Sequence, residues 1–314
     1  MTNLISLVAS EPHYLHHLLP IWEQLPVSMK GDVILGQDVK AGAQHAAHVI
    51  LVAGFADVKN NPTFPYIYVE HGAGQSYIGM DRSVVAYYSG GNAHQRCKMF
   101  LCPNSEVADR WLATYPDKPA VIVGCPRLDS WHAGLRGENE PRTVAVTFHW
   151  DAQFTGVPET TSAFGHYVQD MLDIVIGWKR QGYHVIGHNH PRYTGLAEFW
   201  QGPDMRPYVE YVSDGADVLS RASILVADNT SMQAEFLSLS RPVVWLNHPD
   251  YRRDVEHGGR FWTWPQRAGL QIDTPADLAQ LGLNSVPAAQ WHPYAFADGH
   301  AANRAAAAIV DLLD

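Results

Sequence analysis

The chain has 314 residues, which favours two domains over one, and 46% of them are apolar, enough for each half to bury a core. Its formal net charge of −10 comes from 22 basic and 32 acidic residues. Nucleic-acid binding draws most of its affinity from Lys and Arg, so this balance argues against a long polyanionic partner and gives no strong nucleic-acid signature. It also disfavours adhesion to an anionic membrane.

Cysteine usage and the chain's apolar runs bear on the compartment. Three cysteines without a C-x-x-C pair cannot make a disulfide framework, which indicates a reducing environment. The N-terminal segment has no basic region and only a short apolar stretch, so we interpret it as a first core strand. No apolar run approaches the roughly 20 residues that span a bilayer. We therefore expect no transmembrane segment and a cytoplasmic location.

In the first half, short β-rich apolar runs alternate with helix-compatible stretches, which is typical of α/β architecture. Helices are expected at residues 14–24 and 105–114. His13, His16 and His17 fall on the first helix and are predicted to be surface residues. The predicted strands cover residues 4–8, 32–35, 49–52, 66–69, 99–102 and 120–123.

A polar stretch with Gly and Pro at residues 134–141 suits a linker, and the alternation then restarts. Helices are expected at residues 162–181 and 231–240. An Ala-rich helix at 299–313 ends the chain without a strand after it. The predicted strands of this half cover residues 143–148, 184–187, 208–212, 224–227 and 242–246.

Several standard catalytic motifs are absent. The sequence has no P-loop, no G-x-G-x-x-G, no G-x-S-x-G and no H-E-x-x-H, which argues against a P-loop NTPase, a simple dehydrogenase, a serine hydrolase and a zincin. No Asp-x-Asp pair is available to hold a divalent ion against a diphosphate. We expect no metal and no cofactor, and a binding mode based on backbone, hydroxyls and helix N-termini.

The first candidate site is the run Asp228, Asn229, Thr230 and Ser231, which follows a predicted strand and precedes the helix that carries Glu235. Ligands of open α/β sheets bind beyond the carboxyl ends of the strands. A helix N-terminus there offers N–H groups to a phosphate, and the two hydroxyls would add donors. The alternative is that these residues merely cap the helix.

The second candidate lies at the end of the strand at 66–69, where Glu70, His71 and Gly72 are followed shortly by Gln75. Small residues let a ligand approach the backbone, and a histidine near its ordinary pKa is a good general base for a hydroxyl nucleophile. The alternative is a histidine satisfied by the backbone of a tight turn.

The third candidate is the loop with His188, His190 and Arg192, which ends another strand. The two histidines are two residues apart and could point the same way, as in a metal site. Without a third ligand we favour the other interpretation, in which His190 or Arg192 contacts a phosphate.

Together these segments resemble the CDP-glycerol glycerophosphotransferase family, the teichoic-acid polymerase and primase type, whose members resemble GT-B glycosyltransferases. The family's Tyr-Ser-Ser stands here as Asn229-Thr230-Ser231, and the Thr-Pro expected after the first His-Gly is Ala73-Gly74. The matching segments, in order, are His71-Gly72, Cys102-Pro103-Asn104-Ser105, Gly124-Cys125-Pro126-Arg127-Leu128-Asp129, Thr147-Phe148, His190-Pro191, Asp217 to Val244, and Asp298-Gly299 with Arg304.

The resemblance implies an α/β, GT-B-like fold of two Rossmann-like domains facing across a cleft. Residues 1–140 would form the acceptor domain, residues 141–296 the nucleotide-donor domain, and the helix within 297–314 would pack back on the first domain.

The resemblance also implies the roles of the candidate residues. Asn229, Thr230 and Ser231 would hold the diphosphate of a CDP- or UDP-type donor, beside Asp228, and Glu235 would accept from the ribose hydroxyls. His71 would remove the proton of an acceptor hydroxyl, with Glu70, Gly72 and Gln75 on the acceptor side. His190 and Arg192 would stabilise charge on the departing nucleotide. Two further functions stay open: a UDP-sugar glycosyltransferase or 2-epimerase, and a non-catalytic nucleotide-sugar binding module.

Overall fold

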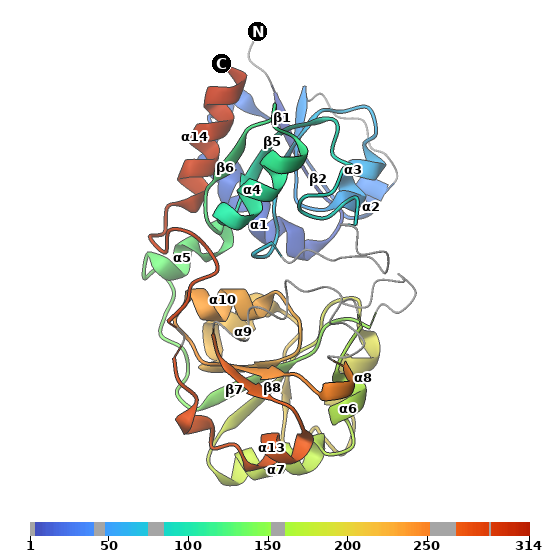
Figure 1. Ribbon diagram of the computed structural model, residues 1–314, viewed down its shortest axis with the longest axis vertical. Helices are drawn as coiled ribbons and strands as arrows, with labels where there is room; N and C mark the ends of the chain where they lie inside the picture. Colours follow the sequence, from blue (N-terminus) through green and yellow to red (C-terminus); the bar gives the residue numbers. More distant parts are fainter. Residues whose placement is uncertain (1–3, 41–47, 75–84, 152–160, 252–267, 289) are drawn as a thin grey trace. The chain divides into compact units, whose positions relative to one another are not determined.

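The structure is a computed structural model and describes residues 4–40, 48–74, 85–151, 161–251, 268–288 and 290–314. The described chain divides into two compact units. Unit 1 contains the described residues up to Gly74, residues 85–135 and Pro293–Asp314, and unit 2 contains those of Arg136–His292. Figure 1 labels their helices and strands.

Unit 1 is built on a six-stranded parallel sheet in the order β2-β1-β3-β4-β5-β6. The chain starts at β1, adds β2 on one side, and then returns to the other side of β1 for β3. Three of these strands, β3, β4 and β6, are apolar along their whole length because helices cover both faces of the sheet. The strands are β1 (Ile5–Ala9), β2 (Lys30–Leu35), β3 (Val49–Val52), β4 (Tyr66–Val69), β5 (Cys97–Cys102) and β6 (Ala120–Ile122).

The two faces of this sheet bury separate apolar clusters. One cluster joins alternate strand residues such as Leu7 and Leu51 to the first and last helices of the unit, while Val8 and Ile50 belong to the other. The final helix, α14, packs against α1 within unit 1 (Figure 1). The helices are α1 (Pro12–Gln24), α2 (Gln37–Lys40), α3 (Phe55–Asn60), α4 (Ser105–Thr114), α5 (Asp129–His132) and α14 (Ala301–Leu313), with short 3₁₀ turns at Val27–Met29 and Pro126–Leu128.

The carboxylate of Asp129 fixes the start of α14. Its two oxygens accept the backbone N–H groups of Ala301 and Ala302, at 2.9 and 2.7 Å. These N–H groups have no partner inside their own helix, so the carboxylate satisfies donors that would otherwise be left over.

Unit 2 repeats the architecture with a second six-stranded parallel sheet, in the order β12-β11-β10-β7-β8-β9. The chain again starts in the middle, at β7, runs outward through β8 and β9, and returns to the other side of β7 for β10. The strands are β7 (Thr143–Thr147), β8 (His184–Gly187), β9 (Glu210–Tyr211), β10 (Ile224–Ala227), β11 (Val243–Leu246) and β12 (Leu270–Ile272).

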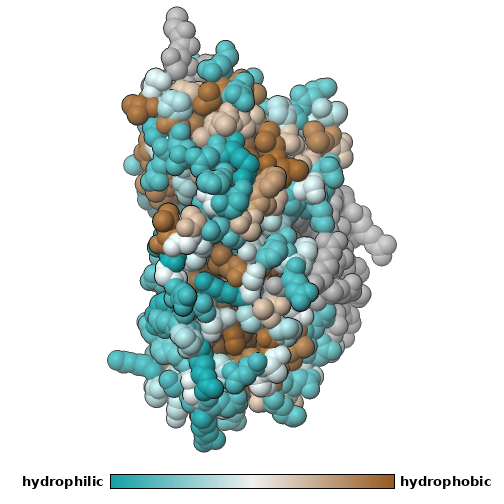
Figure 2. All heavy atoms as spheres, turned by 90° about the vertical axis from the view of Figure 1, so that its left-hand side faces the viewer, coloured by the Kyte–Doolittle hydropathy of each residue, from teal (hydrophilic) through white to brown (hydrophobic). Residues whose placement is uncertain are grey.

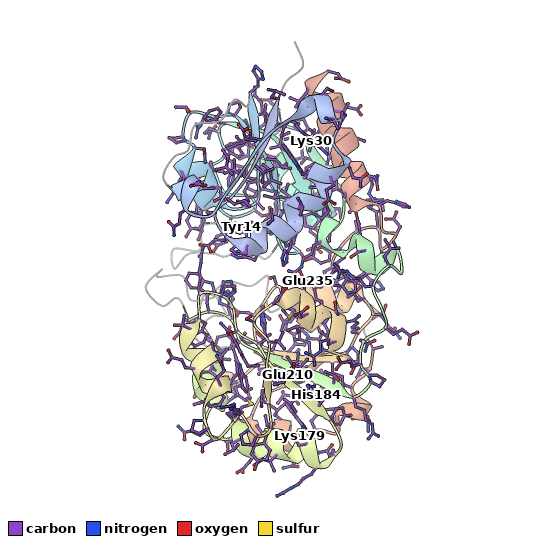
Figure 3. All side chains as sticks on the ribbon, turned by 180° about the vertical axis from the view of Figure 1, so that it is seen from behind. Tyr14, Lys30, Lys179, His184, Glu210 and Glu235 are labelled. Atoms are coloured by element: carbon purple, nitrogen blue, oxygen red, sulfur yellow. The ribbon has the colours of Figure 1, made fainter. Side chains whose placement is uncertain are left out.

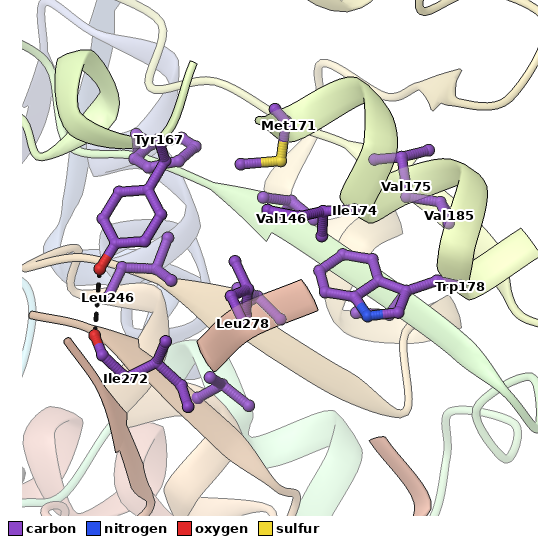
Figure 4. Close-up of a cluster of buried hydrophobic side chains, with 14 of the residues drawn as sticks. Val146, Tyr167, Met171, Ile174, Val175, Trp178, Val185, Leu246, Ile272 and Leu278 are labelled. Carbon is purple, nitrogen blue, oxygen red and sulfur yellow. Dashed lines mark hydrogen bonds between the residues drawn. The ribbon is translucent and has the colours of Figure 1, made fainter. Parts of the chain in front are cut away.

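The core of unit 2 lies between its sheet and the helices, as Figure 4 shows for the side chains around Trp178 and Leu278. The hydroxyl of Tyr167 crosses this core and donates to the carbonyl of Ile272 at 3.0 Å (Figure 4). The helices are α6 (Phe164–Tyr167), α7 (Met171–Arg180), α8 (Thr194–Gln201), α9 (Gly215–Arg221), α10 (Met232–Ser238) and α13 (Pro275–Gln280), with a 3₁₀ turn at Leu283–Ser285.

Several elements of unit 2 differ from the sequence-based expectation, which contained no helix at the positions of α8, α9 and α13. The single helix predicted for residues 162–181 is wrong: α6 and α7 are separated by a turn at residues 168–170. Buried residues continue at helical spacing across this turn, so the apolar pattern hid a break at Asp170, a residue type that favours turns. The short strand β12 was missed, because Gln271 interrupts its apolar run.

Figure 2 presents a face on which hydrophilic and hydrophobic side chains are interspersed. The large hydrophobic side chains that are exposed in the described part of the chain all belong to unit 1, and Val33 and Leu35 among them share β2. Exposed residues of this kind are ordinary on a protein surface. Within the described residues, no helix has the length and apolar character needed to cross a membrane.

Candidate functional site

In unit 2, polar side chains gather at the point in the sheet where the strand order reverses, between β7 and β10. The chain leaves β7 towards β8 and later returns to β10 on its other side, so the loops after β7 and β10 separate at the carboxyl ends of these strands. Open α/β sheets bind ligands at such switch points. Among the described residues that follow β7, β8 and β10, several polar side chains are at least nine-tenths buried, including His149, His188, Asn189, Asp228, Asn229 and Gln233.

Asp228 holds the two loops of this switch point together. One carboxylate oxygen accepts the backbone N–H of His149 at 2.6 Å, and the other accepts the N–H of Ala163 at 2.9 Å and the hydroxyl of Ser162 at 3.3 Å. Burial raises the pKa of Asp228 to about 7, against the lowering effect of these donors. Because both oxygens are engaged, Asp228 positions the loops around the site.

The hydroxyls of Thr230 and Ser231 stand at the start of α10. Ser231 is the N-cap residue, is exposed, and makes no side-chain cap hydrogen bond. The Thr230 hydroxyl accepts the N–H of Met232 only at the long distance of 3.5 Å. The capping alternative therefore gains little support from these two residues, and Asn229 beside them is buried.

Helix α10 itself buries polar side chains, among them Gln233 and Glu235. Gln233 donates to the carbonyl of Ala227 at 3.2 Å, and its Oε1 has no hydrogen-bond partner among the described residues. Glu235, labelled in Figure 3, is 2% exposed. The ribose contact expected of Glu235 would therefore need α10 or its surroundings to open.

The loop after β8 does not bring its two histidines together. His188 is buried and pairs through Nδ1 with the hydroxyl of Thr147 at 2.9 Å. The ring of His190 instead stacks on Trp150, with ring centres 5.9 Å apart. The structure thus gives the two histidines separate environments.

Trp150 is a residue that the sequence interpretation missed. Arg192 lies with its guanidinium carbon 5.1 Å from the centre of the Trp150 ring, and its backbone N–H donates to Nδ1 of His190 at 3.2 Å. His190 and Arg192, predicted to act together, are therefore brought onto one aromatic surface. The available signal was the position of Trp150, three residues after the end of β7.

In unit 1 the corresponding switch point lies between β1 and β3, and His71 reaches it from the end of β4. Its Nδ1 lies 2.6 Å from the carbonyl oxygen of Ala53, which directly follows β3. The Tyr14 ring, on α1 after β1 and labelled in Figure 3, meets the His71 ring edge-on, with ring centres 4.9 Å apart. His71 is half-buried among these groups.

The hydrogen bond to Ala53 fixes which nitrogen of His71 can take a proton. A carbonyl oxygen only accepts, so Nδ1 must carry the hydrogen. In the neutral ring Nε2 then holds the lone pair. The alternative, a histidine whose hydrogen bond is made to the backbone, is therefore true of Nδ1 only. Nε2 carries the lone pair that a general base needs.

Two histidines of α1 join this cluster, with His13 and His17 ring centres 6.3 and 6.5 Å from that of His71. The prediction of a surface position is wrong for His17, which is 5% exposed. Burial lowers the pKa of His17, and Arg127 and the neighbouring histidines lower it further. The missed signal was spacing: His17 falls on the buried face of α1 with Tyr14 and Ile21.

Glu70 and His71 point to opposite sides of the sheet, as successive residues of a strand do. Glu70 faces α4, where its Oε2 accepts the indole N–H of Trp111 at 3.1 Å. Burial raises the pKa of Glu70 to about 7, while Arg110 and the Trp111 hydrogen bond lower it. Glu70 therefore does not share the side of the sheet on which His71 meets α1.

Of the remaining acceptor-side residues, the structure describes Gly72. Gly72 has a φ of +85°, in the region that glycine adopts without strain, and is buried. Gln75 lies outside the described residues, so its predicted place beside His71 stays an expectation.

Comparison with known proteins shows the fold. No family model and no curated protein matches the sequence. Among solved structures, the wall teichoic acid polymerase TagF matches with a TM-score of 0.62 at 13% identity, over 99% of this chain and 89% of that chain. The UDP-GlcNAc 2-epimerase of Methanocaldococcus jannaschii, in complex with UDP-GlcNAc and UDP, matches with a TM-score of 0.59 at 9% identity, over 98% and 99% of the two chains.

The UDP-GlcNAc 2-epimerase of Neisseria meningitidis, bound to UDP-GlcNAc, matches with a TM-score of 0.53 at 11% identity, over 98% and 99% of the two chains. At these identities the likeness concerns the fold alone. The predicted α/β, GT-B-like class is confirmed: both units carry a parallel six-stranded sheet with helices, as in these neighbours.

Proposed function

We propose that the protein is a nucleotide-diphosphate-dependent transferase that moves a glycerophosphate-like or glycosyl group from a CDP- or UDP-type donor to an acceptor hydroxyl. Unit 2 binds the donor, and His71 of unit 1 serves as the general base. The observation that carries the proposal is the gathering of buried polar side chains and of the Thr230 and Ser231 hydroxyls at the switch point of unit 2.

The donor's diphosphate rests against Thr230 and Ser231, the hydroxyls at the start of α10 whose own side-chain bonding is weak or absent. Asp228 keeps the neighbouring loops in place by its bonds to His149 and Ala163. Arg192 is exposed beside the Trp150 ring, and a guanidinium recognises phosphate oxygens through paired N–H donors. His190 and Arg192 then stabilise charge on the departing nucleotide.

His71 takes the acceptor's proton at Nε2 while the acceptor oxygen forms its new bond. In glycerophosphate transfer that bond is to phosphorus, and a P–O bond of the donor diphosphate breaks as the nucleotide leaves. In glycosyl transfer the new bond is to the sugar carbon, and a C–O bond breaks. Both steps balance without a metal ion, and the Ala53 carbonyl keeps the Nδ1 proton in place throughout.

The structural neighbours agree with this class of ligand. TagF, one of them, has been soaked with CDPG, and the epimerases bind UDP-GlcNAc. A second candidate function, epimerisation of a UDP-sugar, is favoured by the match to the epimerase structures over nearly the whole of both chains. The two functions differ in product, since the transferase consumes an acceptor hydroxyl and the epimerase leaves the nucleotide attached.

A panel of CDP-, UDP-, GDP- and dTDP-linked donors tests the proposal by thermal unfolding, because a ligand that binds only the folded state raises its stability. We expect one nucleotide class to raise the melting temperature, and the same donor to be consumed only when an acceptor alcohol is present. No stabilisation by any nucleotide would overturn the donor assignment. Stabilisation without turnover would favour a non-catalytic binding module, and product formation without an acceptor would favour the epimerase.

A further inference from the structure

Three potential metal ligands lie together in unit 2, on elements that the proposed mechanism does not use. His166 belongs to α6, and His248 and Asp250 follow β11. One ligand atom from each of these three residues lies within 4.8 Å of the other two. The rings of His166 and His248 are nearly parallel, at 6°, with centres 4.3 Å apart.

The residue types suit a divalent ion of the zinc class. Zinc and its neighbours in the first transition row bind imidazole nitrogens and carboxylate oxygens at about 2.0–2.2 Å. Two ligand atoms on one such ion are therefore about 3–4 Å apart. To reach that spacing the three side chains need to close by about 1 Å, and one imidazole has to turn out of the stack, because the nitrogen lone pairs of two parallel rings lie in separate planes.

The burial of the three residues indicates how this closing would occur. His166 and His248 are half-buried, whereas Asp250 is exposed. Tyr167, the neighbour of His166, is buried and anchored by its hydroxyl to Ile272 of β12. The backbone that carries His166 is thus held, so the ligand atoms come together by rotation of the side chains.

His248 and Asp250 are already associated. The backbone N–H of Asp250 donates to Nδ1 of His248 at 3.2 Å, and a carboxylate oxygen of Asp250 lies 4.0 Å from the same nitrogen. Nδ1 therefore holds its lone pair on the side of the carboxylate. An ion bound there would replace a long hydrogen bond by a stronger ligand bond.

We propose that His166, His248 and Asp250 bind one divalent ion of the zinc class and thereby link α6 to the segment after β11. Three protein ligands leave one position of a tetrahedral ion for water or a small ligand. The site is independent of the proposed transferase function, because none of its residues belongs to the donor or base assignments. Its expected effect is to stabilise unit 2.

The test is a titration of the metal-stripped full chain with Zn²⁺, followed by calorimetry, and with Co²⁺, followed by visible absorption. We expect one tight ion per chain, a tetrahedral Co²⁺ spectrum and a higher melting temperature with Zn²⁺. The variants are His166→Gln, His248→Gln and Asp250→Asn, and the matched control is His292→Gln, an exposed histidine of the same unit. Loss of one ligand should weaken binding by at least the 10–100-fold that outer-shell changes cost.

The result that would overturn the proposal is wild-type affinity and stoichiometry in His166→Gln and His248→Gln, or the absence of tight binding to the wild type. Equal loss of binding in His292→Gln would overturn it as well, because it would point to a different histidine cluster. Asp250→Asn keeps the test decisive if a histidine variant folds poorly, since its exposed side chain has no role in the core. The melting temperature of each metal-free variant establishes that it is folded.

Discussion

The Nδ1 of His71 lies 2.6 Å from the carbonyl oxygen of Ala53, and this single contact between the ends of β4 and β3 selects the tautomer of the histidine. Because the carbonyl holds the Nδ1 hydrogen, Nε2 is the nitrogen that can accept a proton. The contact is made at the switch point of the unit 1 sheet, where ligands of open α/β sheets bind.

His71→Asn should lower turnover by about 10²–10⁴-fold, the usual contribution of a positioned base. The asparagine side chain is close in size and can still donate to Ala53, but it cannot take a proton. Turnover per folded molecule, measured beside nucleotide affinity, checks this. Affinity should stay nearly unchanged, and His300→Asn, an exposed histidine of the same unit, is the control. Near-normal turnover of His71→Asn would move the base elsewhere, with His190 the next residue to test.

The double variant Thr230→Ala and Ser231→Ala should bind the cognate nucleotide more weakly. Each neutral hydrogen bond contributes about 0.5–1.5 kcal/mol, and one to a charged phosphate oxygen contributes more. Calorimetric titration measures the loss directly. Ser213→Ala removes an exposed hydroxyl beyond the end of β9, at the far side of the same sheet, and should leave the affinity as it is. An unchanged affinity of the double variant would argue against the diphosphate site.

Asp228→Asn should destabilise unit 2. In the wild type, separate carboxylate oxygens accept the N–H groups of His149 and Ala163, so an amide –NH₂ at either position would face a donor. Leaving a buried donor unsatisfied costs about 1–3 kcal/mol. Denaturant unfolding monitors the loss, with Asp170→Asn as the exposed control that makes no side-chain cap bond. If Asp228→Asn instead unfolded like the wild type, the carboxylate would not be what holds these loops.

Glu70 should make the stability of the protein depend on pH in a defined direction. Burial raises the pKa of Glu70 in the folded state to about 7, above the value of about 4.5 that it has when exposed. The folded state therefore binds more protons than the unfolded state between these values, and stability falls as pH rises from about 4.5 to 7. The stabilisation that comes from folding with a protonated Glu70 is complete below about pH 4.5 and lost above about pH 7.

Glu70→Gln should flatten this part of the pH profile, because the amide does not titrate and its oxygen can still accept from Trp111. Unfolding free energies of wild type and variant across pH 4–8 provide the measurement. Glu106→Gln, an exposed carboxylate of α4, controls for the loss of one charge. Parallel profiles for wild type and Glu70→Gln would show that Glu70 titrates normally.

Apolar periodicity was sufficient to predict most of the fold. The continuous apolar runs at Val49–Val52, Tyr66–Val69 and Ile224–Ala227 are strands with the predicted bounds, because the strands of a parallel sheet covered on both faces are mostly apolar. Periodicity did not reveal the turn that ends at Asp170, because buried residues continue at helical spacing across it. Segments ending in Asp228 and His71 were also recognisable, because strand ends are where polar residues resume.

Side-chain partners were decided by tertiary structure alone. Nothing in the sequence indicates that the Asp228 carboxylate accepts the backbone N–H groups of His149 and Ala163, since these residues are 79 and 65 positions away along the chain. Nor does it reveal that His17 is buried beside His71, which depends on how α1 lies on the sheet. Local patterns fix which residues become strands and helices, whereas a hydrogen bond between distant residues exists only after the strands have taken their order in the sheet.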